Sequence, residues 1–264
     1  MSGFAISLHR RNWIYLWDLL YELISRNIKI RYKGSVLGIV WSLIYSLAQV
    51  RVFGFLFHSG LGRDLPNFPT YLFIGVLVWG WFQSSVSVGS DSITSSPELI
   101  RRPGFPAIIL PVVTVATTLV DFIIAIPVLL AFLIFGGSRL MPTLLLLPII
   151  LIIQFLLTLG VVYVVATFQV TFRDTRHIVA VLLRLGFFLT PIFYDPAKMI
   201  PERYLWLYRF NPIVHLLEAY RAVILYGDLP SLESLLMLCG LIAILLPLGF
   251  KLFTNAKYRF LEEL

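Results

Sequence analysis

The sequence predicts an all-α polytopic membrane protein that forms a single domain over residues 1–264. Three observations favour this class. Hydrophobic residues make up 59% of the chain and charged residues only 13%, which leaves too little polar surface to cover a soluble protein. Six apolar runs come near the length of about 20 residues that a helix needs to cross a bilayer. Lysine and arginine gather on one side of these runs, as they do in the cytoplasmic loops of membrane proteins.

We expect a six-helix membrane bundle over residues 36–254. The predicted spans are Val36–His58, Tyr71–Gly89, Ala107–Phe135, Thr143–Phe172, Ile178–Tyr194 and Leu232–Phe253. The third and fourth spans are long enough to tilt or to extend beyond the bilayer. The fifth span is short and contains Arg184, which we expect either to line a hydrated passage or to reach the cytoplasmic edge.

The basic residues set the orientation of the bundle. On one side lie Arg10, Arg11, Arg26, Lys29, Arg31, Lys33, Arg101, Arg102, Arg173, Arg176, Lys251, Lys257 and Arg259. On the other side lie Arg63, Arg139, Lys198, Arg203, Arg209 and Arg221. The positive-inside rule therefore places both termini in the cytoplasm. The formal net charge of +7 follows from these cytoplasmic bases and gives no reason to expect a nucleic acid partner.

Within the interfacial segment 1–33, residues Trp13–Lys33 predict an amphipathic helix. We expect no cleaved signal, because this segment lacks a long apolar core and a small-residue cleavage site. Apolar residues recur at helical spacing at Trp13, Leu16, Trp17, Leu20, Ile24 and Ile28. Such a helix lies in the plane of the membrane surface with its bases toward anionic lipid. It is either a plain membrane anchor or a rim that receives an anionic lipid headgroup. In the second case the contacts would come from Arg26, Lys29, Arg31 and Lys33.

The loop between the second and third spans predicts a helix of one or two turns on the cytoplasmic face. Ser96 before Pro97 and Glu98 is a typical helix start, and Pro103-Gly104 ends the helix. The helix is either a simple capped turn or a docking surface for a soluble partner.

Residues 195–230 form an outer segment that is too apolar for a solvated loop and too broken for a span. Asn211-Pro212 divides it into two short helices, because the residue before a proline avoids the α conformation. Two short helices that re-enter the membrane from outside would form a gate over a pathway. The alternative is a hairpin that lies on the outer surface.

Two further charged residues lie inside predicted spans. Arg51 and Asp121 each follow the cytoplasmic start of their span by about fifteen residues, which places both roughly 20 Å deep. Equal depth and opposite charge predict a structural ion pair, since lone charges are costly in lipid.

The sequence shows no signature of covalent chemistry. It has no Walker phosphate loop, no Gly-x-Ser-x-Gly motif and no pair of carboxylates in a span. The histidines are scattered, and the single Cys239 fits a small core residue. We therefore expect no catalytic residue, no metal and no cofactor in this chain, and no enzymatic activity of its own.

Three short signatures, in this order and spacing, resemble the transmembrane subunits of ABC-2 type exporters. They are RYKGSVLGIVW at Arg31–Trp41, Phe172-Arg173-Asp174 followed by Thr190–Tyr194, and Asn211-Pro212. The resemblance covers nearly the whole chain. It points to the branch that exports lipid-linked polysaccharides, which includes O-antigen, capsule and teichoic-acid permeases, and most of all to the O-antigen permeases. One departure is Ser46, near a position where the family usually has a proline.

The resemblance implies a homodimer in the inner membrane, with one substrate pathway between the two copies. Each copy would bind one cytoplasmic ATPase subunit, which holds ATP and Mg²⁺. The substrate would be an undecaprenyl-pyrophosphate-linked polysaccharide that leaves the cytoplasm. The contacts to the ATPase would come from Glu98, Leu99, Ile100, Arg101 and Arg102 in a coupling helix, and from Arg173 and Asp174. Asn211 and Pro212 would belong to the outer gate.

A sugar polymer would need flat side chains along its path, because aromatic rings provide rigid stacking surfaces. The candidates are Trp41, Tyr45, Phe187, Phe188, Phe193 and Tyr194, with Trp79, Trp81 and Phe82 as a further set. Aromatic residues make up 15% of the chain, so the alternative is that these rings simply pack against neighbours or lipid.

Other functions stay open on the sequence alone. An ABC exporter of teichoic acid, capsule or drugs would share the same fold, and a passive channel or scaffold would need no ATPase. A membrane glycosyltransferase would need catalytic carboxylates at the membrane boundary, which the sequence provides poorly.

Overall fold

The computed structural model is helical throughout its regular elements, and it describes residues 2–34, 38, 40–57, 67–136, 140–196 and 201–263. In chain order the helices are α1 (Ser2–Tyr32), α2 (Val40–Phe57), α3 (Phe68–Ser90), α4 (Pro97–Ile100), α5 (Ile109–Phe135), α6 (Leu147–Thr171), α7 (Thr175–Leu189), α9 (Glu202–Arg209), α10 (Pro212–Arg221) and α11 (Leu232–Glu263). A 3₁₀ turn, η1 (Pro142–Leu146), precedes α6, and a π-helical turn, η2 (Ala222–Tyr226), follows α10. The predicted all-helical class is confirmed for the described residues.

Within the described residues, four helices are long and apolar enough to cross a membrane. They are Phe68–Ser90, Ile109–Phe135, Pro142–Thr171 and Leu232–Ala256. These match the second, third, fourth and sixth predicted spans, whereas the count of six spans stays a prediction. Leu43–Phe55 in α2 is apolar but shorter. Outside the described residues lie the predicted ends of the first span (Val36 and His58), the bases Arg63, Arg139 and Lys198, and positions 35–37 and 39 of the first signature.

The fifth predicted span is wrong at its outer end. α7 has 15 residues and stops at Leu189, so that Tyr194 lies beyond the helix. Thr190 is extended, with φ −95° and ψ 135°, because the proline that follows disfavours the α conformation at this position. The backbone from Thr190 to Tyr194 therefore has to find hydrogen-bond partners outside a helix.

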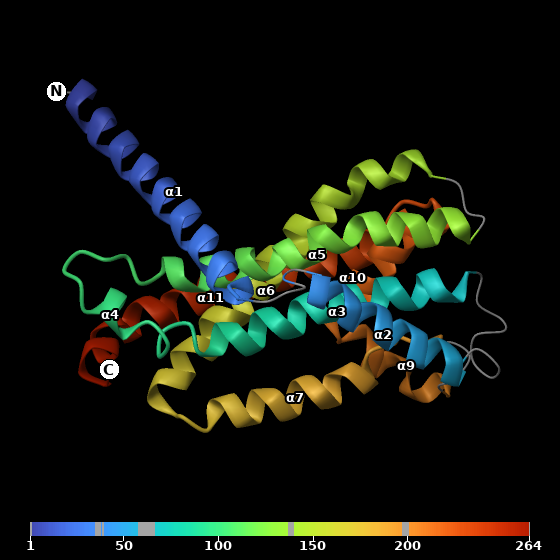
Figure 1. Ribbon diagram of the computed structural model, residues 1–264. Helices are drawn as coiled ribbons and strands as arrows, with labels where there is room; N and C mark the ends of the chain where they lie inside the picture. Colours follow the sequence, from blue (N-terminus) through green and yellow to red (C-terminus); the bar gives the residue numbers. More distant parts are fainter. Residues whose placement is uncertain are drawn as a thin grey trace.

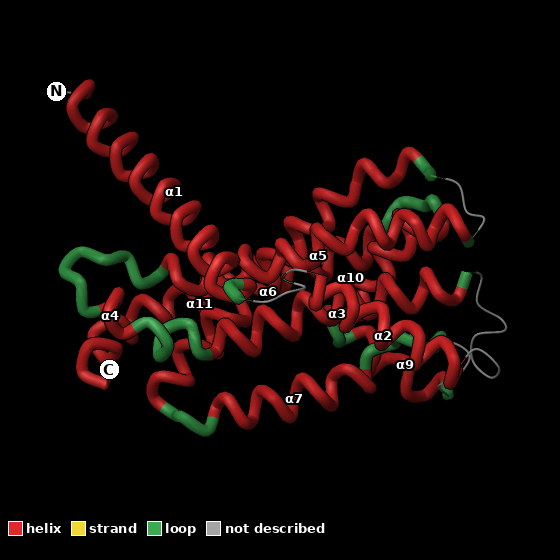
Figure 2. The backbone as a smooth tube through the Cα atoms, in the orientation of Figure 1, coloured by secondary structure: helices red, strands yellow, loops and turns green. Residues whose placement is uncertain are grey.

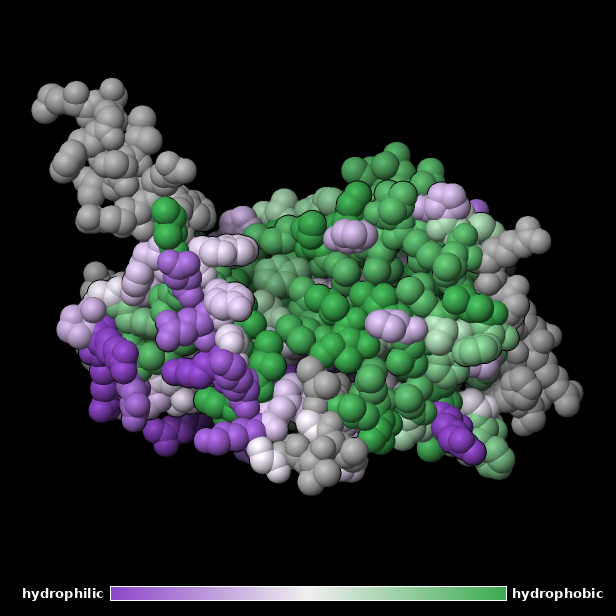
Figure 3. Space-filling model, turned by 45° about the horizontal axis from the view of Figure 1, so that its top comes forward, coloured by the Kyte–Doolittle hydropathy of each residue, from purple (hydrophilic) through white to green (hydrophobic). Residues whose placement is uncertain are grey.

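α3 forms the centre of the bundle. It packs against α2, α5, α6, α7 and α10, while α6 packs along α11. The long helices have roughly aligned axes, and α1 leaves the bundle at an angle (Figures 1 and 2). α1 begins and α11 ends toward the same end of the bundle as the short α4, on the left in Figure 1. Hydrophilic residues gather at this end in Figure 3, and hydrophobic residues cover most of the remaining face.

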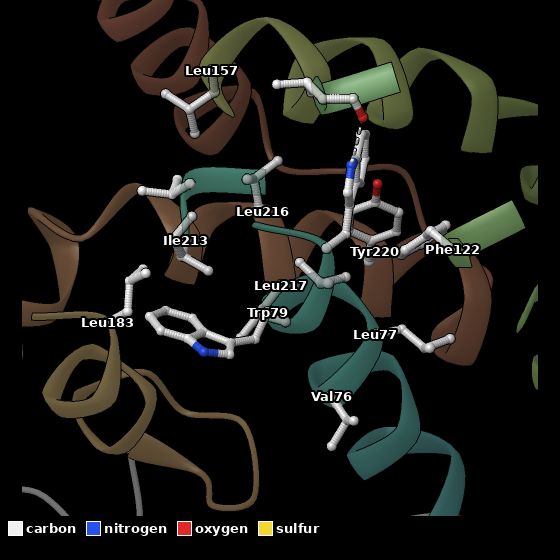
Figure 4. Packing of buried hydrophobic residues seen from close by; sticks show 14 of the residues in the cluster. Val76, Leu77, Trp79, Phe122, Leu157, Leu183, Ile213, Leu216, Leu217 and Tyr220 are labelled. Carbon is white, nitrogen blue, oxygen red and sulfur yellow. Dashed lines mark hydrogen bonds between the residues drawn. The ribbon is translucent and has the colours of Figure 1, made fainter. Parts of the chain in front are cut away.

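α10 lies inside the bundle and not on its surface. Leu216, Leu217 and Tyr220 are each 0% exposed. They lie near Trp79 of α3 and Phe122 of α5 (Figure 4), and the rings of Tyr220 and Phe122 are 5.9 Å apart. The surface-hairpin alternative is therefore wrong for α10, whereas α9 keeps an aromatic side chain exposed.

α1 begins earlier than predicted, at Ser2, and part of its apolar face packs on protein. Leu23 is 5% exposed and forms a small cluster with Ile109 and Val113 of α5. Leu99 of α4 packs against the same cluster. This helix therefore buries apolar surface against α4 and α5, where the amphipathic pattern alone predicted contact with lipid.

The crossing of α6 and α11 depends on glycine. A Cβ atom at Gly249 would lie 2.7 Å from the backbone oxygen of Gly160, so a larger residue does not fit there. A Cβ atom at Gly240, in the same helix, would meet nothing within 4 Å. The two positions differ in packing and share their helix, which makes them a matched pair.

We predict that Gly249→Val destabilises the protein by about 1–3 kcal/mol, the usual cost of overpacking. The control Gly240→Val should cost much less, because its side chain enters open space. Thermal unfolding of the purified variants in detergent measures both effects. Equal losses of stability in the two variants would contradict the role of this crossing.

Candidate functional site

The C-terminal end of α1 reaches the middle of α5. Arg31 donates from Nη1 to Oδ2 of Asp121 at 2.6 Å, and the hydroxyl of Tyr32 donates to Oδ1 of the same carboxylate. The side chains of Arg31 and Asp121 are 32% and 24% exposed. Burial and the neighbouring carboxylate raise the pKa of Tyr32, so its hydroxyl keeps the proton that it donates.

The predicted ion pair between Arg51 and Asp121 is wrong. Asp121 pairs with Arg31 instead, and Arg51 is exposed on α2. Counting residues along the spans placed Arg51 and Asp121 at one depth. It left open which helix packs beside Asp121, and the end of α1 takes that place.

A cavity of about 350 Å³ lies beside the Arg31–Asp121 ion pair. Its lining includes Arg31, Tyr32, Trp41, Tyr45, Ser84 and Asp121. Trp41 and Tyr45 are 55% and 65% exposed, so their ring faces are open to a ligand. The first signature thus brings a base, a hydroxyl and an aromatic ring to one cavity, and α5 adds a carboxylate.

The other three bases of the predicted lipid-pyrophosphate site lie apart from this cavity. Arg26, Lys29 and Lys33 are exposed on α1 or directly after it. Arg26 lines a second cavity, of about 260 Å³, together with Leu99 and Arg102. The structure therefore divides the predicted set, with Arg31 beside Asp121 and Arg26 beside the loop that carries α4.

α4 is a single turn with one buried side and one charged side. Ile100 is 8% exposed, and Leu99 is half-buried against the cluster around α1. The charged residues are exposed: Glu98, Arg101 and Arg102. The side chain of Ser96 makes no capping hydrogen bond, and its backbone carbonyl accepts the N–H groups of Leu99 and Ile100 instead. The apolar side chains of the turn thus pack against the protein, and its charged side chains face away from it.

Arg173 and Asp174 are exposed in the turn between α6 and α7. Sequence reasoning counted the nearby Arg176 only as a cytoplasmic base and gave it no partner. Arg176 lies with Nε 3.6 Å from Oδ2 of Asp91 at the end of α3, and its backbone N–H donates to the side chain of Gln169 at 2.8 Å. No sequence spacing links Arg176 to Asp91, because only the packing of α3 against α7 brings them together.

Two of the sequence signatures meet at the end of the bundle opposite α4. The side chain of Asn211 caps α10 by accepting the N–H of Ile213 at 3.0 Å. The amide nitrogen of Asn211 donates to Oγ1 of Thr190 at 3.1 Å. Pro212 takes the first position of α10, where a helix needs no N–H. Asn211 therefore joins the start of α10 to the non-helical segment Thr190–Tyr194, which we call the break after α7.

Arg221, at the C-terminal end of α10, forms hydrogen bonds to the same break. Its side chain is buried, and Nη2 donates to the carbonyl groups of Pro191 at 2.9 Å and Ile192 at 3.0 Å. The guanidinium lies 3.4 Å from the centre of the Tyr71 ring, whose hydroxyl donates to the carbonyl of Tyr194 at 2.9 Å. Sequence reasoning counted Arg221 only as an outer base. The available signal was an arginine within an otherwise apolar stretch.

The aromatic candidates divide into open and packed rings. The packed group is Phe187, Phe193 and Tyr194, which join Phe53 with ring centroids 5.2–6.2 Å apart. The open group is Trp41, Tyr45 and Phe188. Trp79 and Trp81 are buried in the core, so the structure favours packing for them.

In the part of the chain that the structure describes, no three His, Cys, Asp or Glu side chains come close enough to hold a metal ion. The buried His215 contacts Oγ of Ser234 at 2.9 Å and the carbonyl oxygen of Arg209 at 2.8 Å. Through these bonds His215 joins α10 to the end of α9 and to the start of α11, which is a structural role.

We predict that Arg221→Met destabilises the protein by about 2–4 kcal/mol, because two carbonyl groups lose their buried donor. Arg209→Met in the same outer segment is the control, since Arg209 is exposed. Thermal unfolding followed by circular dichroism compares the two. A loss for Arg221→Met no larger than for Arg209→Met would show that the break after α7 does not need the guanidinium.

Known proteins resemble this chain over most of its length. The profile of the family described as ABC-2 type transporter matches residues 18–225. The O-antigen export system permease protein RfbA of Myxococcus xanthus is 35% identical over 248 residues, which cover 93% of this chain and 95% of that protein. RfbA of Klebsiella pneumoniae is 33% identical over 254 residues, or 95% and 96%. The polysialic acid transport protein KpsM of Escherichia coli is 24% identical over 245 residues, or 89% and 92%. This chain therefore belongs to the ABC-2 type transporter family.

Proposed function

We propose that this chain is the transmembrane permease of an ATP-driven exporter, and that it moves an undecaprenyl-pyrophosphate-linked polysaccharide of the O-antigen kind across the inner membrane. One observation carries this proposal: permeases named for O-antigen export match the chain over nearly its whole length. A more distant relative is named for the transport of polysialic acid, which favours a polysaccharide substrate in general. The chain would be a transport subunit, and its partner would hydrolyse ATP.

The pathway is inferred from polar residues on exposed faces of neighbouring helices. Gln83, Ser84 and Ser87 of α3 are exposed, as are Arg51 of α2 and Arg184 of α7. α2 and α7 both pack against α3, and the ring of Phe53 on α2 contacts that of Phe187 on α7. Polar and charged side chains at membrane depth face a water-filled passage or a protein partner rather than lipid. A second copy of the chain, packed over this face, would enclose the passage and complete a homodimer.

The aromatic candidates fit this passage unequally. Trp41 and Tyr45 of α2 and Phe188 of α7 have open rings on the helices that carry the polar face. They would provide flat surfaces on which successive sugars stack with little loss of rotamer entropy. Phe193 and Tyr194 would instead support the outer end of the passage, because their rings pack into the core.

The cytoplasmic contacts are assigned to the exposed charges at the end that carries α4. In this proposal each of two ATPase subunits binds Glu98, Arg101 and Arg102 of one copy. Leu99 and Ile100 pack against the protein and fix the position of the turn. Arg173 and Asp174 would form the second contact. Both termini would then lie in the cytoplasm, in agreement with the positive-inside rule.

The outer gate is assigned to α9, α10 and the break after α7. Asn211 and Pro212 start α10 beside Thr190, and Arg221 bonds the break from the far end of α10. This gate would close the passage when no polymer is present, because its bonds run between elements that must separate for a polymer to pass.

Export of teichoic acid, capsule polysaccharide or a drug is the alternative within the family, and a passive channel is the alternative outside it. Purification of the tagged chain from its native membrane separates them. A copurifying ATPase, and export of labelled lipid-linked polysaccharide into proteoliposomes that requires ATP, are the expected results. Translocation by the isolated chain without an ATPase would overturn the proposal.

We predict that replacing Glu98, Arg101 and Arg102 together by alanine lowers substrate-stimulated ATP hydrolysis about five-fold or more, the scale of an ordinary coupling energy. The reconstituted complex provides the measurement. Membrane insertion should stay normal, since these side chains are exposed. Lys251→Ala, an exposed base on α11, is the control. Full coupling in the triple variant would remove α4 from the ATPase contact.

We also predict that replacing Arg26, Lys29, Arg31 and Lys33 by glutamine weakens binding of undecaprenyl pyrophosphate at least about ten-fold. Each base near an anionic lipid contributes about 1 kcal/mol. Binding to protein in neutral nanodiscs is the measurement, and glutamine at Arg10 and Arg11 of the same helix is the control. Unchanged lipid binding in the quadruple variant would leave α1 as a membrane anchor only.

A further inference from the structure

The cavity beside α1 contains opposite charges in one place. Of the described residues that line it, Arg31 is the one base and Asp121 the one acid. The ion pair uses Nη1 of Arg31, while a guanidinium carries five N–H donors in a planar fork. A phosphate that enters the cavity therefore meets a cation that already has a carboxylate at 2.6 Å.

This arrangement disfavours a bare phosphate. A phosphate bonded to Arg31 would lie within a few ångströms of the Asp121 carboxylate, and two anions at that distance repel each other. If the phosphate instead displaced Asp121 from Arg31, the carboxylate would lose its ionic partner in a half-buried place. Both outcomes lower the affinity unless the ligand also supplies hydrogen-bond donors to Asp121.

A sugar next to the phosphate supplies those donors. An ionised carboxylate only accepts hydrogen bonds, and sugar hydroxyl groups are donors of the right kind. Trp41 and Tyr45 lie in the same lining with open rings, so a sugar ring that stacks on either of them lies beside Asp121. A site with a polar group that needs a substrate hydroxyl rejects analogues that lack it, because the group is then left unpaired.

We propose that the cavity binds the junction between phosphate and sugar of a lipid-linked saccharide, with Arg31 on the phosphate and Asp121 on the hydroxyl groups of the first sugar. Asp121 is then the residue that makes the site bind a sugar-bearing lipid more tightly than the abundant anionic lipids of the membrane. This inference rests on the proposed function and adds to it the basis of headgroup selection.

The test compares two probes in the purified dimer or monomer, held in nanodiscs of neutral phosphatidylcholine. The probes are undecaprenyl pyrophosphate and the same lipid bearing one hexose. The wild-type protein should prefer the sugar-bearing lipid about ten-fold, a gap of 1.4 kcal/mol. Asp121→Asn should bind the bare lipid about five-fold or more tightly than wild type, and its preference should fall toward one. Arg31→Gln should weaken both lipids.

Two further variants control the result. Asp91→Asn also removes a carboxylate that pairs with an arginine, but Asp91 does not line the cavity, so the preference should stay as in wild type. Tyr32→Phe keeps the ion pair and frees Oδ1 of Asp121, so the preference should rise about two-fold, and this variant serves if Asp121→Asn does not fold.

The outcomes separate the inference from the proposed function. Equal binding of the two lipids by the wild-type protein, or an unchanged preference in Asp121→Asn or Tyr32→Phe, overturns the role of Asp121 and leaves the exporter proposal standing. An equal loss of both lipids in Asp121→Asn shows a purely structural ion pair and overturns it too. Failure of the wild-type protein to bind either lipid counts against the proposed function itself.

Discussion

The packing at one end of the molecule depends on hydrogen bonds to the non-helical backbone after α7. Pro191 and Ile192 follow the last turn of a helix, and Arg221 supplies the donors that their carbonyl groups would otherwise lack. Pro191 begins the break, and the guanidinium stabilises it with hydrogen bonds that lipid could not supply. Arg221 belongs to α10, which lies inside the bundle, and the ring of Tyr71 on α3 contacts its guanidinium. A gate at this place can open only if these bonds are exchanged for others.

The opposite end is organised by α1. Leu23 packs with α5, and Leu99 of α4 packs against the same cluster. Further along α1, Arg31 reaches Asp121. One rigid helix thus contacts both the turn assigned to ATPase coupling and the cavity assigned to the lipid headgroup. α1 therefore connects, through its packing, the turn that carries α4 and the ion pair beside the cavity.

Local sequence signals predicted much of the fold. Four long apolar runs became membrane-length helices that start within about three residues of their predicted starts, because hydropathy over such lengths leaves few alternatives. Asn211-Pro212 divides the outer segment as expected, since a proline restricts the residue before it. The same rule applied at Pro191 would have ended the fifth helix at Leu189. The early start of α1 had no clear signal, because Ser2 lies well before the amphipathic stretch.

The sequence by itself determined the helical membrane class, the positions of most spans and the membership in a transporter family, because these depend on composition and on short ordered motifs. Only the tertiary structure decided which partners the charged and aromatic groups have. Asp121 pairs with Arg31 and not with Arg51, and Arg221 bonds a backbone break rather than solvent. Likewise Trp41 is open while Tyr194 is buried. Each of these outcomes depends on which helices lie side by side, and residue spacing along one chain does not contain that information.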